Sequence, residues 1–485
     1  METHFEYIKE QASAQAGKKF REFSARARPL GKIAAVLFLT LLLMIPLGYI
    51  TDQITSRENR QNQVTAEIAD TAASAQTVIG PILVINYRTK TPEKIYHDEL
   101  SGKILTQAGS YSEHVMYIPA RNLAIRGSAS VESRYRGIYQ ARLFHLDAKV
   151  EGSFEPSADA LNIPDGSEFA DASATILFSI SDPRGLDSDP DVLVEGKLLH
   201  FRTTNDKRFE SLMGGSQLKI DLGAWMPGNA HPIAFSFPLK LTGTEALSIS
   251  PTAENNTVEL SSAWKHPSFA GRFLPRQRTI NEKGFTAQWE VSQLARNLTK
   301  AIQGESTYRE SSNKDDAEVL KIRFVNPVNI YLQAERAVKY GSLFIVLTFA
   351  AFFIGEALRR RPMHIMQYAL VGLALAIFFL LLIALSEHLP FALAYLAGAT
   401  ACIGLIVGYL AGVFGSWRRA SGFGAGFATL YGMLFAILRL EDIALLMGSL
   451  LLFAALAAVM FSTRRLDWYQ LKQGEAITET GGEWK

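Results

Sequence analysis

The feature that most constrains the fold of this chain is the placement of its apolar runs. Stretches of about 20 residues with few charges, long enough for a helix to cross a bilayer, lie near the N-terminus and beyond Tyr340. The segment between them, residues 51–340, is polar and rich in turn residues. A single soluble domain is therefore excluded. We expect a membrane protein that holds one large domain outside the bilayer.

Six such runs are present, and we predict that each one is a transmembrane helix. They are Ile33–Ile50, Gly341–Leu358, Ile365–Leu385, Leu389–Val413, Gly422–Leu438 and Ile443–Phe461. The first run is longer than the apolar core of a cleaved signal peptide, which has about 7–15 residues. We therefore expect the first run to remain as an anchor, with the other five forming a helical bundle over residues 341–461.

Basic residues beside the runs predict the orientation of the chain. Lysine and arginine in short loops mark the cytoplasmic side of a membrane. They cluster within residues 1–32 before the first run, and again at Arg359–Arg361, Arg418–Arg419 and Arg464–Arg465. Six spans that start from a cytoplasmic N-terminus place all of these clusters inside. We therefore predict a multi-pass protein with both termini, including the tail 462–485, in the cytoplasm.

The polar segment 51–340 changes its hydrophobic period along its length. At its start Val64, Ile68 and Ala72 recur at helical spacing, and residues 329–341 show the same period, so we expect a helical stalk at each end. Between the stalks, short runs alternate with a period of two and are separated by Gly, Pro, Asn and Asp. These runs include Val78–Tyr87, Val115–Ile118, Arg121–Val131, Thr175–Ser181, Gln217–Asp221 and Ile233–Leu241. We expect a mainly antiparallel β domain, built as a sandwich or a large curled sheet.

Composition and motifs narrow the function. The chain has 49 Lys and Arg against 47 Asp and Glu, which excludes a nucleic-acid binder driven by net charge. The sequence has no phosphate-binding glycine loop, no His-Glu-x-x-His zinc motif and no Gly-x-Ser-x-Gly nucleophile motif. Its nine histidines are scattered singly, and its one cysteine cannot close a disulfide within the chain. We therefore expect a protein with no cofactor, no metal site and no catalytic centre.

The most informative charges lie where the predicted helices reach the outer surface. Glu387 and His388 end the third run, and Arg439, Glu441 and Asp442 lie in the loop between the last two. Charges beside hydrocarbon are costly, so they are usually paired or functional. One interpretation is a shared polar site, in which an Arg439 to Glu387 pair docks the outer domain or admits a proton or solute. The alternative, which we favour, is ordinary hydrated loop charge.

A similar polar set lies at the predicted inner face. It consists of Glu356, His364 and Gln367, and Glu356 can pair with Arg359 or Arg360 at helical spacing. A structural role is the stronger interpretation here.

Small residues form a pattern within the fourth run. Gly404, Gly408 and Gly412 recur every four residues, and Gly422 and Gly426 repeat the spacing. Such stripes let helix backbones approach closely. They can mark helix-packing positions or line a path, and we favour helix packing.

Several short motifs follow one another in order between about Arg57 and Trp468. They are Ile79-Gly80-Pro81-Ile82-Leu83, Trp264-Lys265-His266-Pro267-Ser268-Phe269, Gly284-Phe285-Thr286-Ala287-Gln288-Trp289, Gln367-Tyr368-Ala369-Leu370, Ser386-Glu387-His388 and Glu441-Asp442. In these motifs the chain resembles the CreD family of inner-membrane proteins, also called cell envelope integrity proteins. The resemblance implies a Gram-negative inner-membrane protein associated with envelope stress and a two-component response. It implies no catalytic residue.

Three functional hypotheses follow. The leading one is a non-enzymatic protein that supports envelope integrity, using its periplasmic β domain to contact periplasmic protein, lipid or peptidoglycan while the helices hold it in the lipid bilayer. The second is a transporter or extractor of a lipid or small amphiphile. The third is a membrane-embedded hydrolase or transferase that uses Glu387, His388 and Asp442 as acid-base groups.

Overall fold

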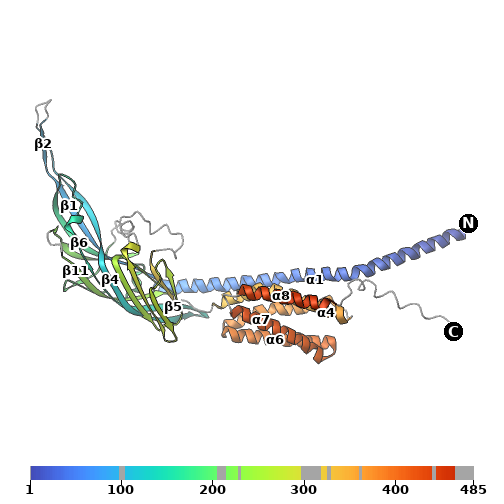
Figure 1. Cartoon of the computed structure of the whole chain (residues 1–485). Coiled ribbons are helices and arrows are strands. Elements are labelled where there is room, and N and C mark those ends of the chain that lie inside the picture. The colour runs from blue at the N-terminus through green and yellow to red at the C-terminus, as the bar shows by residue number, and fades with distance from the viewer. Residues whose placement is uncertain are drawn as a thin grey trace. The chain divides into compact units, whose positions relative to one another are not determined.

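The computed structural model describes residues 2–97, 104–204, 215–227, 231–295, 318–324, 329–359, 363–439 and 444–464. The chain divides into two compact units (Figure 1). The helical unit contains Met1–Arg60 and Val328–Lys485, and the β unit contains Gln61–Pro327.

Long helices build the helical unit. They are α1 (Glu2–Thr71), α4 (Ile330–Arg359), α5 (Ile365–Ser386), α6 (Phe391–Phe414), α7 (Trp417–Arg439) and α8 (Ala444–Thr463). Among the described residues, five helices are long and apolar enough to span a membrane, and these are α1, α4, α5, α6 and α7. The described apolar part of α8, Gly448–Phe461, is shorter. The membrane character is confirmed, whereas the number of six spans stays a prediction.

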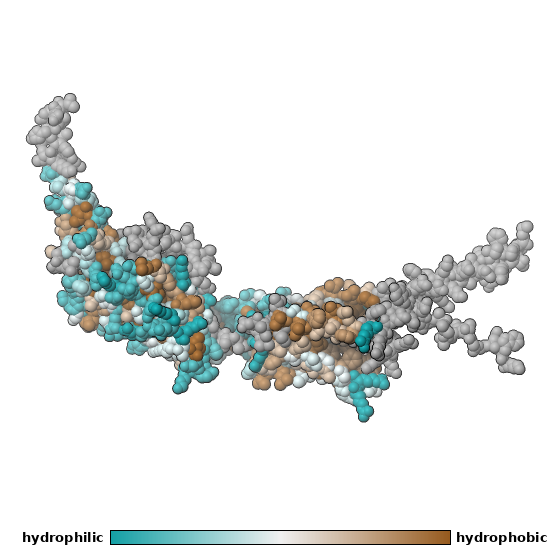
Figure 2. Space-filling model, in the orientation of Figure 1, coloured by the Kyte–Doolittle hydropathy of each residue, from teal (hydrophilic) through white to brown (hydrophobic). Residues whose placement is uncertain are grey.

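One face of α1 packs against the bundle. Leu43, Leu47 and Ile54 on this face are buried, whereas Leu41 and Ile45 on the opposite face are exposed. Figure 2 shows apolar residues over the surface of the helices. An apolar surface of this kind suits contact with lipid chains.

The glycine prediction is wrong for Gly404, Gly408, Gly412, Gly422 and Gly426. No heavy atom of the described residues lies within 4 Å of a Cβ placed on any of them. Close helix approach instead occurs at Gly424, where a Cβ would lie 2.6 Å from Cγ2 of Val407. The four-residue spacing places these glycines on one face of each helix. Spacing alone does not indicate whether that face contacts a neighbouring helix.

The β unit is built from strands that all follow α1 and precede α4 in the chain. The strands are β1 (Gln76–Thr91), β2 (Lys94–His97), β3 (Ile104–Gln107), β4 (Ser110–Arg136), β5 (Tyr139–Phe154), β6 (Glu168–Ile180), β7 (Asp191–Val194), β8 (Lys197–His200), β9 (Arg202–Thr204), β10 (Ser216–Ala224), β11 (Ile233–Thr244), β12 (Ala246–Ser250), β13 (Ala253–Ser262), β14 (Pro267–Gly271), β15 (Gln277–Asn281), β16 (Gly284–Ser292) and β17 (Leu320–Phe324). Most pairs are antiparallel, and β1 with β12 and β4 with β13 are parallel. The predicted mainly antiparallel β domain is confirmed.

Fifteen of these strands form one hydrogen-bonded sheet that folds into two layers. The first layer runs β14-β17-β12-β1-β6-β10-β9, and the second runs β15-β16-β13-β4-β5-β11-β7-β8. The long strand β4 belongs to both, because residues 110–119 pair with β1 and residues 122–136 pair with β5. The sequence showed two separate runs here, Val115–Ile118 and Arg121–Val131, and the structure joins them in one strand. Pro119 lies where β4 leaves β1, a position at which a missing N–H is tolerated.

The core lies between the two layers and is rich in aromatic rings. Phe178 on β6 contacts Phe237 on β11 at 5.3 Å between ring centroids. Phe269 on β14 meets Trp289 on β16 edge-on at 5.6 Å. Trp289 is fully buried, and its Nε1 donates to the carbonyl oxygen of Phe273 at 3.2 Å. These contacts join strands of opposite layers and fix the faces that point inward.

The end of α1 docks on the second layer. Val64 and Ile68 are buried against Ala141 and Leu143 of β5. Arg136, at the end of β4, forms an ion pair with Glu67. The helical pattern seen in the sequence therefore corresponds to a helix face that β5 covers.

Candidate functional site

Glu387 is the residue of the predicted outer cluster with the most confined environment. It follows the last turn of α5, and its side chain is 9% exposed. Its Oε1 lies 3.5 Å from Nη1 of Arg57 on α1, whose side chain is 49% exposed. The same oxygen has no hydrogen-bond partner among the described residues. Glu387 and Arg57 therefore form an ion pair, and their 3.5 Å separation is too long for a good hydrogen bond.

The rest of the predicted cluster does not assemble around Glu387 in the described residues. The suggested Arg439 to Glu387 pair is replaced by the Arg57 pair, and the Arg439 guanidinium lies over the ring of Phe435 at 5.3 Å. His388 is exposed. Glu441 and Asp442 lie outside the described residues. The contacts of the described residues in this cluster indicate a structural role for their charges.

Glu58 and Asn329 form further contacts between α1 and the bundle. Glu58, next to Arg57 on α1, accepts a hydrogen bond of 3.4 Å from Nδ2 of Asn329. Asn329 also caps α4, because its Oδ1 accepts from the backbone N–H of Tyr331 at 3.0 Å. Adjacent residues of α1 thus bind the end of α5 and the start of α4.

The inner polar set ties helices together as well. Lys32 on α1 forms an ion pair with Glu356 and donates to the carbonyl oxygen of Met363 at 2.7 Å. The Tyr368 hydroxyl donates to Oε2 of Glu356 at 3.1 Å. The side chain of Arg359 and all of Arg360 lie outside the described residues, so the suggested local pairs remain predictions.

His364 and Gln367 cap α5. Nδ1 of His364 accepts from the backbone N–H of Met366 at 3.2 Å, and Oε1 of Gln367 accepts from the backbone N–H of His364 at 3.2 Å. This reciprocal pattern is a capping box. The structural interpretation of both side chains is supported by these contacts.

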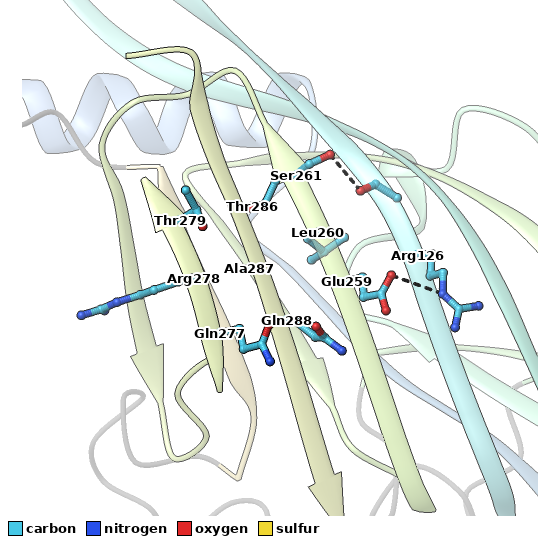
Figure 3. Close-up of a pocket in the computed structure, with 11 residues that line it drawn as sticks. Arg126, Glu259, Leu260, Ser261, Gln277, Arg278, Thr279, Thr286, Ala287 and Gln288 are labelled. Atoms are coloured by element: carbon cyan, nitrogen blue, oxygen red, sulfur yellow. Dashed lines mark hydrogen bonds and ion pairs between the residues drawn. The ribbon is translucent and has the colours of Figure 1, made fainter. Parts of the chain in front are cut away.

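A hollow of about 360 Å³ lies on the β unit, on the face of the second layer that points away from the core (Figure 3). It spans four neighbouring strands, β4, β13, β16 and β15. Register places polar side chains of these strands in one row, which consists of Arg126, Glu259, Gln288 and Gln277. The next row on this face adds Ser261, Thr286 and Thr279. Because side chains alternate between faces along a strand, the apolar residues between these positions point into the core.

Charge is nearly balanced inside the hollow. Nε of Arg126 lies 3.3 Å from Oε2 of Glu259, and its Nη1 lies 3.8 Å from Oε2 of Glu151 on β5. Figure 3 shows the Arg278 side chain extending away from the hollow. The groups that remain along the floor are hydroxyls and amides. The hollow can therefore donate and accept hydrogen bonds without presenting a strong field of either sign.

A buried polar junction fixes the start of β1 beside the end of α1. The Asp182 carboxylate accepts from the backbone N–H and the hydroxyl of Ser74, both at 3.0 Å, and from Nη2 of Arg184 at 2.7 Å. The Arg184 guanidinium, helped by Ser74, holds the pKa of Asp182 well below its usual range. Nε2 of Gln76 donates to the carbonyl oxygens of Asp182 and Thr242 at 3.0 and 3.1 Å. Sequence reasoning missed this junction, because its residues come from separate parts of the chain.

No group of three or more His, Cys, Asp or Glu within the described ranges is placed to hold a metal ion. The single cysteine, Cys402, is buried in the helical unit, where it accepts a hydrogen bond of 3.3 Å from the Tyr431 hydroxyl.

Comparison with known proteins gives a match over most of the chain. The family model described as inner membrane protein CreD matches residues 28–469. The curated Escherichia coli protein named inner membrane protein CreD is 32% identical over 446 residues, which covers 90% of this chain and 93% of that protein.

The likeness to solved structures is weak. An M1 zinc metallopeptidase from Deinococcus radiodurans aligns with 36% of this chain and 39% of its own length, at 10% identity and a TM-score of 0.20. A putative nutrient binding protein from Legionella pneumophila aligns with 46% of this chain and 73% of its own length, at 9% identity and a TM-score of 0.20. Scores this low support no argument about fold or function.

Proposed function

The chain belongs to the CreD family of inner membrane proteins, and on this basis we propose that it supports the integrity of the bacterial cell envelope by binding an envelope component through its β unit. It does so as a non-enzymatic protein, anchored in the lipid bilayer by its helices. The observation that favours a binding role is the hollow on the second layer, where polar groups of four strands converge. Ligands usually bind in concave sites, and the largely polar lining of this hollow suits a polar ligand.

The described charges of the helices favour this role over transport. Lys32 with Glu356 and Arg57 with Glu387 are paired near the ends of apolar segments. A path for a polar solute usually places ionisable groups facing the interior of the bundle at mid-depth. The paired charges instead fit the anchoring of helices to one another.

The proposal includes a topology of six spans, with the β unit in the periplasm between the first two and both termini in the cytoplasm. A cysteine-labelling experiment tests it in the Cys402→Ser background. A membrane-impermeant maleimide applied to spheroplasts should label Ser133→Cys on β4 and should leave Thr478→Cys in the C-terminal tail unlabelled until the membrane is opened. Labelling of the tail in sealed spheroplasts contradicts the topology.

The binding role is tested with the full chain purified in detergent. The probes are isolated peptidoglycan sacculi and vesicles of phosphatidylethanolamine and phosphatidylglycerol, and the measurement is cosedimentation. A deletion strain should lose tolerance to an envelope-directed agent and regain it with the wild-type chain. If neither probe binds and the deletion strain tolerates the agent fully, the proposed function is wrong.

A further inference from the structure

The hollow on β4, β13, β16 and β15 has a lining that selects for one chemical class of ligand. We propose that it binds a neutral sugar chain that bears acetamido groups. This inference rests on the proposed function and names the ligand of that binding role.

Arginine residues at the hollow either have acidic partners or point away from it. Arg126 is neutralised by Glu259 at 3.3 Å and by Glu151 at 3.8 Å, and Arg278 extends away from the hollow. In the adjoining row, Arg276 forms an ion pair with Glu290. Binding of a phosphate-rich or acidic polymer requires cations that lack acidic partners. The lining does not favour such a polymer, and it favours a ligand without net charge.

The uncharged polar side chains of the hollow are amides and hydroxyls. Gln277 and Gln288 are directly paired across β15 and β16, so their two primary amides stand side by side, and Nε2 of Gln288 also donates to Oε1 of Glu290 at 3.3 Å. Each amide has a carbonyl acceptor and an NH₂ donor, which matches the N–H and C=O of an acetamido group. Thr279 and Thr286 are paired in the next row, and their hydroxyls both donate and accept. Sugar hydroxyls have the same dual character.

The polar side chains of the hollow are regularly spaced. Neighbouring strands of a sheet lie about 4.8 Å apart, and residues two apart on one strand share a face. The two rows of the hollow therefore form a regular grid of polar groups on a rigid surface. Successive rings of a sugar chain can hydrogen-bond to successive positions of this grid. Because the strands hold the side chains in place, less conformational freedom is lost on binding.

Lipid and extended peptide fit the lining less well. The side chains that line the hollow are mostly polar or charged, and its apolar members, Leu260 and Ala287, are buried toward the core. A lipid chain needs an apolar groove. An extended peptide added to a sheet bonds along an edge strand, whereas the hollow extends over the face of four strands.

The test measures binding of oligosaccharides to the full chain in detergent by isothermal titration calorimetry. The probes are the tetramer of N-acetylglucosamine, the β-linked glucose tetramer and polyglutamate. We expect the acetamido tetramer to bind, the glucose tetramer to bind more weakly and polyglutamate not to bind. Gln288→Ala with Thr286→Ala should weaken binding of the acetamido tetramer by about tenfold, since a hydrogen bond contributes about 1 kcal/mol.

The matched control is Gln140→Ala with Ser130→Ala, on β5 and β4 outside the hollow. The control should bind like the wild-type chain, and circular dichroism should show that both double variants are folded. Unchanged binding in the hollow variant overturns the assignment to this site. Binding of polyglutamate, or no difference between the two tetramers, overturns the ligand class. If sacculi or vesicles bind while the acetamido tetramer does not, this inference fails and the proposed function stands.

Discussion

Arg57 on α1 and Glu387 at the end of α5 form an ion pair with 3.5 Å between Nη1 and Oε1, and the two residues differ sharply in exposure. The Glu387 side chain is 9% exposed, whereas that of Arg57 is 49% exposed. This asymmetry means that the two partners are not equivalent in a mutation experiment. Removing the cation leaves a buried carboxylate, and removing the carboxylate leaves an arginine that water can solvate.

We therefore expect Arg57→Ala to destabilise the helical unit by about 2 kcal/mol, because the buried Glu387 carboxylate loses its cation. Glu387→Gln keeps the shape of the side chain and should cost about 1 kcal/mol or less. Thermal unfolding in detergent measures both, and the double variant gives their coupling. An Arg57→Ala variant as stable as the wild-type chain contradicts the role of the pair.

The junction at Asp182 gives a second prediction. Asp182→Asn removes the charge that Arg184 binds at 2.7 Å and weakens the hydrogen bonds from Ser74. We expect the free energy of unfolding of the β unit to fall by about 2 kcal/mol at neutral pH. Circular dichroism during chemical unfolding of the full chain provides the measurement. Asp171→Asn, which breaks the exposed pair with Arg88, is the control and should have a smaller effect.

The same carboxylate predicts a pH dependence. The pKa of Asp182 is lowered in the folded state, chiefly by Arg184, relative to about 3.9 in an unfolded chain. A lowered pKa means that ionised Asp182 stabilises the fold above about pH 4 and that this stabilisation is lost as pH falls further. The wild-type chain should therefore lose more stability than Asp182→Asn when the pH drops from about 4 to about 2. Parallel pH profiles of the two chains contradict this prediction.

Local patterns in the sequence predicted the helices and several strands of this protein but not the partners of these elements. The period of two located β1, β4, β6, β10 and β11, and helical spacing at Val64 and Ile68 indicated the face of α1 that β5 covers. These features depend on neighbours within a few residues. They are therefore visible in a single sequence.

Contacts between distant segments were not predictable in the same way. A pair of Glu387 with Arg439 was one interpretation of the sequence, beside the favoured one of hydrated loop charge, yet the partner of Glu387 is Arg57, which lies far away in the chain and comes close only where α1 packs on the bundle. Glu356 likewise meets Lys32 of α1. The hollow was also missed, because the register of four strands brings its lining together. Register depends on the whole pattern of pairing and not on any one strand.

The two kinds of glycine in the helical unit give a fourth prediction. A Cβ on Gly372 of α5 would clash with Cδ1 of Leu43 on α1 and would lie 2.9 Å from Cζ of Phe349 on α4. Gly372→Ala should therefore destabilise the helical unit by about 1–2 kcal/mol. Gly408→Ala, at an open position, should be neutral or slightly stabilising, since alanine favours a helix over glycine by about 1 kcal/mol. Thermal unfolding in detergent distinguishes the two, and equal effects would show that the close approach at Gly372 does not matter.

The docking of α1 on β5 gives the last prediction. Val64 is 1% exposed and Ile68 is 8% exposed, and both pack on Ala141 and Leu143. Ile68→Ala removes buried methyl groups and should cost about 3 kcal/mol, and Val64→Ala should cost about 2 kcal/mol. The loss should be local, because these contacts form a cluster apart from the main core.

Hydrogen exchange measured by mass spectrometry tests this locality. Peptides from the end of α1 and from the start of β5 should lose protection in both variants, while peptides that contain the buried Trp289 of β16 keep theirs. Gln63→Ala, at an exposed position of the same turn, should leave all of these peptides unchanged. If protection falls equally around Trp289, the docking contacts and the main core unfold as one unit, and the β unit then depends on α1 for its whole fold.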